Sequence, residues 1–324
     1  MTTTDIKTNH IRAWLLAARP QTLTAAAVPV MIGIAFAIHR MGLLTFTSSQ
    51  MTQFGICTSP FVAAVLCLLF AFAMQIDANF VNDYFDCVKG NDDQETRLGP
   101  KRACTEGWIT LKAMRWGIGI TTVISCLIGL PLILFGGWEM VLIGVACVVF
   151  CFLYTTLLSY HGLGDILVLV FFGIVPVCMT YYVVLPMSLQ SISTDVVLVS
   201  IACGLVIDTL LVINNYRDID NDRKANKITL VVKIGKQRAE KLYNNLGAIG
   251  MILVFLLNIG VNAPFGHIIM SIVCFIPYSI LHQRAFIKMK TIGGGKTLNA
   301  VLGETARNIL VFGISTVVII LLFY

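Results

Sequence analysis

Two segments of the chain place amide and carboxylate side chains where long apolar runs end. They are NFVNDYFDCVKGNDDQ at 79–94 and NNYRDIDNDRKANKITL at 214–230. Each contains the pattern N-x2-[N/D]-x3-D, whose three positions share one helical face because they are spaced i, i+3 and i+7. The residues at these positions are Asn79, Asn82, Asp86, Asn215, Asp218 and Asp222. The recurrence predicts two related helices that face each other across a cavity.

These positions offer only oxygen atoms, the ligands that Mg²⁺ prefers, and none of the cysteine or histidine ligands of a zinc site. Two such faces predict two Mg²⁺ ions around a diphosphate. Asp86, Asp218 and Asp222 are then the candidate catalytic residues, because the ions that they hold would offset the negative charge on the leaving group. The alternative is that the residues only solvate helix ends. However, Asp77 and Asn79 still belong to the apolar run, and polar groups inside membrane helices are functional by default.

Basic residues follow both motifs and are candidates for binding the diphosphate. Arg and Lys are the usual partners of phosphate oxygens, through forked or single charge-assisted hydrogen bonds. The candidates are Arg97, Lys101 and Arg102 after the first motif and Lys227 after the second. The other interpretation is that these residues only set the orientation of the chain in a membrane.

The composition limits which elements can position these groups. The 324 residues are 57% hydrophobic and 12% charged, whereas a soluble domain is about a quarter charged. We therefore expect an all-α membrane protein, one polytopic domain over 1–324, with a central cavity and with helices 1–4 and 5–8 as a pseudo-repeat. Nine spans are predicted, at 21–39, 57–83, 111–135, 138–157, 163–187, 195–216, 243–261, 265–283 and 305–323.

The basic residues also predict the orientation of these spans. All of the 23 Lys and Arg residues except Arg40 fall on one side, which the positive-inside rule assigns to the cytoplasm. The N-terminus is then cytoplasmic, the C-terminus is extracytoplasmic, and the cavity opens to the cytoplasm. The ten cysteines mostly lie in apolar runs, so we expect small buried thiols rather than disulfides or metal ligands.

With these motifs the chain resembles the UbiA superfamily of intramembrane prenyltransferases over nearly its whole length. That family carries an N-x3-D motif after helix two and a D-x3-D motif after helix six, matched here by Asn82 to Asp86 and Asp218 to Asp222. One departure is Asn226, where the family often has glycine, but Asn also adopts the left-handed backbone conformation. The menaquinone-pathway branch is most similar, on ARPQTL (18–23), NDYFD…RLGPKRA (82–103), GLGDILVLVFFGIVPV (162–177) and RDIDNDRKANKITLVVKIG (217–235).

The resemblance implies transfer of a polyprenyl group from polyprenyl diphosphate to 1,4-dihydroxy-2-naphthoate, with loss of diphosphate and CO₂, to give demethylmenaquinol. It also implies Mg²⁺ and a multi-pass protein of the bacterial inner membrane. Tyr154 is then a candidate beside the reacting carbon, since aromatic faces stabilise cations, unless it is an interfacial tyrosine. Arg19 and Asp165 are candidates for binding the acceptor, unless Arg19 only snorkels and Asp165 only caps a helix.

Two other functions fit part of the pattern. Another aromatic acceptor, 4-hydroxybenzoate-like or haem, would use the same diphosphate chemistry. A cation-coupled secondary transporter would use the intramembrane acids Asp77 and Asp208, but most polar residues gather at one membrane face and not at the midplane. The pattern indicates neither a nucleic-acid partner nor a protein partner.

Overall fold

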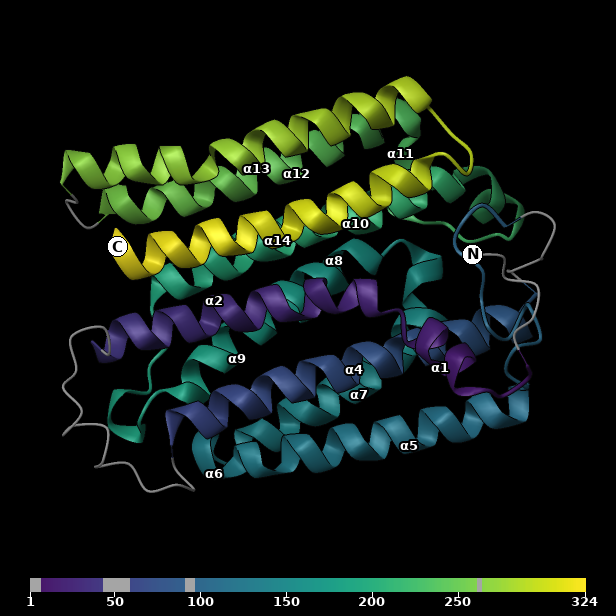
Figure 1. Cartoon of the computed structure of the whole chain (residues 1–324), viewed down its shortest axis with the longest axis horizontal. Coiled ribbons are helices and arrows are strands. Elements are labelled where there is room, and N and C mark those ends of the chain that lie inside the picture. The colour runs from purple at the N-terminus through teal and green to yellow at the C-terminus, as the bar shows by residue number, and fades with distance from the viewer. Residues whose placement is uncertain (1–6, 43–58, 91–96, 261–263) are drawn as a thin grey trace.

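The computed structural model describes residues 7–42, 59–90, 97–260 and 264–324. Every regular element within these ranges is helical, and nine helical segments are long and apolar enough to cross a membrane. They lie side by side in one bundle (Figure 1). The expected all-α membrane fold with nine spans is therefore confirmed.

The first four spans combine long helices with short turns of 3-10 helix. Pro20 and Pro131 each stand in such a turn, because proline lacks the N–H that a continuing α-helix requires. The elements of this half are α1 (Ile11–Ala18), η1 (Pro20–Thr22), α2 (Leu23–Met41), α4 (Pro60–Val88), α5 (Leu111–Gly129), η4 (Leu130–Leu132), α6 (Ile133–Gly136) and α7 (Glu139–Thr156).

The fifth span is irregular, since a π-helical segment, η6, separates two short α-helices. Such segments are rare and often occur at functional sites. The elements of the second half are η5 (Leu158–His161), α8 (Gly164–Val168), η6 (Leu169–Ile174), α9 (Val175–Val184), η7 (Met187–Leu189), α10 (Thr194–Lys224), α11 (Leu230–Ile234), α12 (Lys236–Gly260), α13 (Phe265–Ile292) and α14 (Leu298–Leu322).

The two ends of the bundle differ in charge. α1, α11 and the C-terminal ends of α4 and α10 lie at one end, and the C-terminal end of α14 lies at the other (Figure 1). Arg40, in the last turn of α2, lies at the α14 terminus end. We call the α1–α11 end the basic end, because Arg12 of α1, Lys224 in the last turn of α10 and Lys233 in the last turn of α11 lie there.

The helices continue further toward the basic end than hydropathy predicts. α4 ends at Val88 instead of residue 83, and α10 ends at Lys224 instead of residue 216. Hydropathy detects where an apolar run stops, whereas backbone hydrogen bonding propagates through the polar residues that follow. Both polar motifs therefore lie on the final turns of helices and not in loops.

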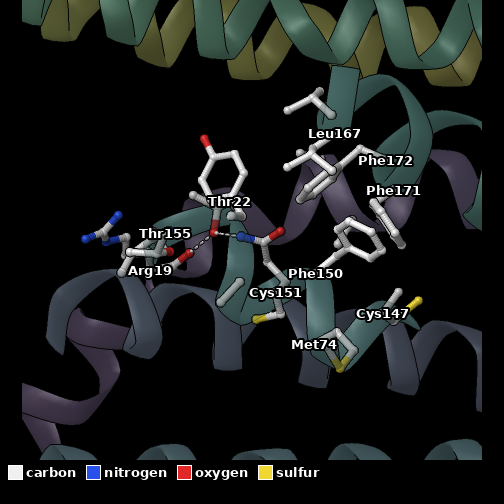
Figure 2. Close-up of a pocket in the computed structure, with 18 of the residues that line it drawn as sticks. Arg19, Thr22, Met74, Cys147, Phe150, Cys151, Thr155, Leu167, Phe171 and Phe172 are labelled. Atoms are coloured by element: carbon white, nitrogen blue, oxygen red, sulfur yellow. Dashed lines mark hydrogen bonds between the residues drawn. The ribbon is translucent and has the colours of Figure 1, made fainter. Parts of the chain in front are cut away.

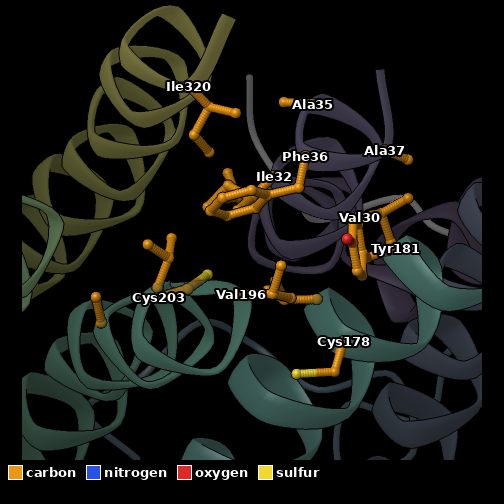
Figure 3. Packing of buried hydrophobic residues seen from close by; sticks show 14 of the residues in the cluster. Val30, Ile32, Ala35, Phe36, Ala37, Cys178, Tyr181, Val196, Cys203 and Ile320 are labelled. Atoms are coloured by element: carbon orange, nitrogen blue, oxygen red, sulfur yellow. The ribbon is translucent and has the colours of Figure 1, made fainter. Parts of the chain in front are cut away.

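Small residues bring the central helices into close contact. Phe36 of α2, Cys203 of α10 and Ile320 of α14 belong to one interior cluster (Figure 3). A Cβ atom on Gly33 would lie only 2.7 Å from the carbonyl oxygen of Val177 in α9, so α2 and α9 touch through their backbones. Such contacts matter in lipid, where van der Waals packing drives helix association. The nine cysteines of the described residues are free thiols, as expected.

Candidate active site

A cavity of about 870 Å³ lies inside the bundle and reaches from its interior to the basic end. Arg19 and Thr155 lie on one side of the lining and Phe150, Phe171 and Phe172 on the other (Figure 2). The expected central cavity is therefore present. Its polar and apolar portions suit a ligand with a charged head and an apolar tail.

The first motif occupies the last turns of α4. Asp86 is paired with Arg102, whose Nη2 lies 2.9 Å from Asp86 Oδ2. Asn82, one turn earlier, lines the same cavity and accepts a hydrogen bond from the Thr155 hydroxyl of α7. α4 thus presents an amide and a carboxylate to the cavity from one face.

The segment after α4 is held in place by an acid between the two motif positions. Asp83 is buried, and its carboxylate accepts hydrogen bonds from the backbone N–H groups of Ala103 (2.9 Å) and Cys104 (3.1 Å). Because Arg102 directly precedes these residues, this anchor brings its guanidinium to Asp86.

The second motif lies on the last turns of α10 and lines the same cavity. Asp218 accepts two hydrogen bonds from the Arg217 guanidinium, at 2.8 Å from Nε and 2.5 Å from Nη2. Asp222 lies 3.7 Å from the Lys227 ammonium, and its Oδ2 is buried without a hydrogen-bond partner. Asn215 also lines the cavity. The motifs on α4 and α10 therefore share one cavity.

Asn79 is the predicted ligand that does not line this cavity. Its amide nitrogen donates to the Ala18 carbonyl (2.9 Å) and the Thr22 hydroxyl (3.0 Å), and Gln75 donates to its amide oxygen (3.5 Å). The junction between α1 and α2 covers it. Its helical register is right, but this packing uses its amide to hold the start of the first span, so we do not retain Asn79 among the metal-ligand candidates.

The donor atoms at the cavity suit Mg²⁺ but do not form a closed cage. They are carboxylate and amide oxygens from two helices, and one of them, Asp222 Oδ2, lacks a partner. Within the described ranges, no three acidic, histidine or cysteine side chains cluster closely enough to hold a metal by themselves. Mg²⁺ usually keeps waters and shares its site with substrate phosphates, so the arrangement fits an ion held jointly by protein and diphosphate.

The predicted diphosphate-binding cations Arg97, Lys101, Arg102 and Lys227 all line the cavity. They differ in their surroundings. The Arg102 side chain is 11% exposed, whereas that of Lys101 is 54% exposed and lies 2.8 Å from Glu106. Arg102 is therefore the better placed of these two neighbours.

Asn226 sets the position of Lys227. It adopts the expected left-handed conformation, with φ of 54°. The Lys227 backbone N–H can then donate to the carbonyl of Asp222 at 2.8 Å. This hydrogen bond caps the C-terminus of α10. The asparagine therefore keeps the loop geometry for which the family often uses glycine.

The acceptor candidates are separated. Arg19, with φ of 49°, lines the polar part of the cavity, and Tyr154 lines it too. Asp165 instead lines a much smaller adjoining pocket, and its Oδ1 has no hydrogen-bond partner. The N-cap of α8 is Leu163, so the interpretation of Asp165 as a capping residue is wrong.

The acids that a transporter would use do not line the main cavity. Asp77 accepts hydrogen bonds from the hydroxyls of Thr121 and Thr122 (2.8 Å for Thr122) and so joins α4 to α5. Asp208 is buried within α10.

The sequence prediction missed polar residues of α10 that line the cavity, namely Asn214, Arg217 and Asn221. The sequence prediction treats Arg217 only as one of the charges that set the orientation in the membrane. The available signal is its place directly before Asp218, in the middle of the second motif.

Comparison with known proteins agrees with this geometry. Residues 42–293 match the UbiA prenyltransferase family. The chain is 36% identical to the 1,4-dihydroxy-2-naphthoate octaprenyltransferase of Haemophilus influenzae, over 69% of this chain and 70% of that one. It is 34% identical to the protein of the same name from Escherichia coli, over 74% of each chain, and 30% identical to that from Mycobacterium tuberculosis, over 93% and 94%.

Solved structures of UbiA homologues share the fold. The apo homologue from Aeropyrum pernix superposes with a TM-score of 0.62 at 14% identity, covering 89% of this chain and 97% of that one. A homologue from Archaeoglobus fulgidus bound to GPP and Mg²⁺ gives 0.57 at 15% identity, covering 94% and 99%. At such low identities the likeness is one of fold.

Proposed function

Because the chain belongs to the UbiA prenyltransferase family, we propose that it transfers a polyprenyl group from polyprenyl diphosphate to 1,4-dihydroxy-2-naphthoate. The products are diphosphate, CO₂ and demethylmenaquinol. The names of the bacterial relatives support this acceptor. The observation that carries the proposal is the shared cavity, in which acidic motifs from α4 and α10 meet an apolar interior.

We assign the charged head of the donor to the basic end. Arg97, Arg102 and Lys227 would bind its phosphate oxygens. Mg²⁺, which we propose as two ions, would be held by the protein oxygens and would stabilise negative charge on the diphosphate as the allylic C–O bond breaks. The proposed protein ligands are Asn82, Asp86, Asn215, Asp218 and Asp222.

The tail of the donor would occupy the apolar interior, beside Phe150, Phe171 and Phe172. Keeping each CH₂ group out of water is worth about 0.8 kcal/mol, so the prenyl tail stays in an apolar environment while the head reacts. The electron pair of the breaking C–O bond leaves with the diphosphate. The resulting allylic cation would be stabilised by the face of Tyr154.

The acceptor carboxylate would lie at Arg19, at the polar end of the cavity. The ring carbon that bears this carboxylate attacks the allylic cation, and loss of CO₂ returns the C–C electron pair to the ring. Fixing the acceptor beside the cation makes the attack effectively intramolecular. Asp165, in the adjoining pocket, stays a candidate for contact with the acceptor.

The proposal is tested by mass spectrometry of the lipid product. Purified protein receives Mg²⁺, a mixture of prenyl diphosphates and 1,4-dihydroxy-2-naphthoate. We expect a demethylmenaquinol product that disappears when EDTA removes the metal. 4-Hydroxybenzoate offered alone should give no product. Prenylation of 4-hydroxybenzoate in preference to the naphthoate would overturn the proposed acceptor.

A further inference from the structure

Arg217 is a buried cation whose hydrogen bonds join three parts of the bundle. Its residue is only 3% exposed. Beyond the two hydrogen bonds to Asp218, Nη2 donates to Asn214 Oδ1 at 2.8 Å and Nη1 donates to Asn299 Oδ1 at 2.8 Å. The guanidinium has five N–H donors, and these four bonds orient it completely.

Asn299 links Arg217 to the segment that follows α4. It stands in the first turn of α14 and donates through Nδ2 to the carbonyl oxygen of Leu98 at 2.8 Å. Gly99 lies directly against the same guanidinium, since a Cβ atom there would be 2.7 Å from Arg217 Nη2 and 3.2 Å from its Cζ. The segment that begins at Leu98 and Gly99 continues to Arg102, which pairs with Asp86.

We propose that Arg217 and Asn299 are positioning residues that lock the two halves of the diphosphate site together. We call them the Arg217–Asn299 brace. It holds the Asp218 carboxylate toward the cavity and fixes the backbone at Leu98 and Gly99. Through that backbone it sets where Arg102 stands relative to Asp86.

The geometry favours this role over direct binding of the diphosphate by Arg217. Its donors already serve Asp218, Asn214 and Asn299, and releasing them would leave the half-buried Asp218 carboxylate without its partner, which is costly. Asn299 does not line the cavity, so any effect of changing it must pass through Arg217 or through the Leu98 backbone.

The proposed role of the brace rests on the proposed function. Binding of Mg²⁺ with inorganic diphosphate tests the brace and the proposed function together, and it requires no catalytic turnover. Isothermal titration calorimetry on the purified protein gives the affinity directly. We expect Asn299→Ala and Gly99→Ala each to weaken binding about tenfold, because losing one hydrogen bond to a charged group costs about that factor. Gly99→Ala removes no charge and no hydrogen-bonding group, but its methyl would press on the Arg217 guanidinium and, at 3.2 Å, on Nη2 of Arg97. Asn299→Ala is therefore the variant that tests the brace without touching a proposed diphosphate ligand.

The matched control is Gly303→Ala, one turn further along α14. No atom lies within 4 Å of a Cβ atom built at Gly303, so this variant should bind as the wild type does. Arg217→Lys combined with Asn299→Ala should weaken binding by less than the product of the two single effects, since changes within one network are not additive.

Each outcome is decisive. If the wild type fails to bind Mg²⁺ with diphosphate, the proposed function itself falls. If the wild type binds and Asn299→Ala and Gly99→Ala bind equally well, the brace falls and the proposed function stands. A steady-state check uses the same variants, where KM for the prenyl diphosphate should rise and KM for the naphthoate should not. A rise in both would indicate general damage and reject the brace.

Discussion

At the scale of single residues, each motif carboxylate that lines the cavity has a cationic neighbour. Asp86 pairs with Arg102, and Asp222 lies near Lys227. Asp218 pairs with Arg217. Taking one member of a partly buried pair away leaves a charge without compensation, which costs more than the pair itself contributes. We therefore expect a substitution in one of these ion pairs to lower activity more when the side chain that it replaces is more deeply buried.

Arg102 and Lys101 allow a direct comparison of neighbouring cations. Arg102→Gln should lower kcat/KM for the prenyl diphosphate by at least about tenfold, the cost of one charged hydrogen-bond partner. Lys101→Gln should have a much smaller effect, since its ammonium is half exposed and paired with Glu106. Steady-state kinetics with each substrate varied separately measures both. Equal losses would show that burial does not decide which cation binds.

The motif carboxylates themselves should be indispensable. Asp86→Asn and Asp218→Asn keep the side-chain size but remove the charge, and each should lower turnover by on the order of a hundredfold or more. The matched control is Asp195→Asn, at the other end of α10, where the carboxylate only accepts a hydrogen bond from Tyr324 (2.6 Å). Product formation from labelled prenyl diphosphate is the measurement. Near-normal turnover of either motif variant at saturating Mg²⁺ would contradict the metal assignment.

At the scale of elements, the π-helical segment η6 shapes the apolar part of the cavity. Phe171 and Phe172 belong to η6 and line the cavity, and Phe171 packs on Phe150 of α7 with ring centroids 5.0 Å apart. On its other side η6 touches α10 through Gly173, where a Cβ atom would lie 2.6 Å from Gly204 Cα. The close backbone contact holds both phenylalanines in register with the motif helix.

Gly173→Ala tests this contact. The nearest atoms to the new methyl are backbone atoms of α10, which cannot rotate away, so we expect a loss of about 1–3 kcal/mol, as for overpacking in general. Thermal unfolding in detergent should show a lower apparent Tm. Gly119→Ala on α5, with no atom within 4 Å of its Cβ position, is the control. Equal Tm values for the two variants would mean that the contact can relax.

At the scale of the whole molecule, the two motif helices are the second and sixth spans. This spacing accords with the proposed pseudo-repeat of helices 1–4 and 5–8, which stays a prediction. Both motifs reach the basic end, and so do α1 and α11 (Figure 1). Under the proposed function, the charged head of the donor would lie at this end of the cavity and its tail in the apolar interior.

The predicted orientation can be measured with reporters. One inserted at Gly107, an exposed position between α4 and α5, should be cytoplasmic, and one fused after Tyr324 should be extracytoplasmic. The positive-inside rule is the physical reason. Each position is fused in turn to a reporter that is active only in the cytoplasm and to one that is active only outside it, and the active fusion shows on which side the position lies. Both reporters on the same side would contradict the nine-span topology.

The sequence by itself determined the nine spans, the basic end and the two motif helices, since hydropathy and i, i+3, i+7 spacing depend only on nearby residues. It also identified Asp86, Asp218 and Asp222 as candidates, because carboxylates beside apolar runs are conspicuous. Span ends were less predictable, because helical hydrogen bonding continues past the apolar run, to Val88 and Lys224.

Only the tertiary structure decided which of those polar groups face the cavity. Asn79 has the right helical register, but the α1–α2 junction takes its amide. From the sequence, Arg217 is interpreted only as one of the charges that set the orientation in the membrane. In the structure, Asn299, far along the chain, accepts a hydrogen bond from Arg217 and donates one to the carbonyl of Leu98. Spacing along one helix determines on which side of the helix a side chain lies. The residue that it contacts there belongs to another helix, and only the packing of the helices brings the two residues together.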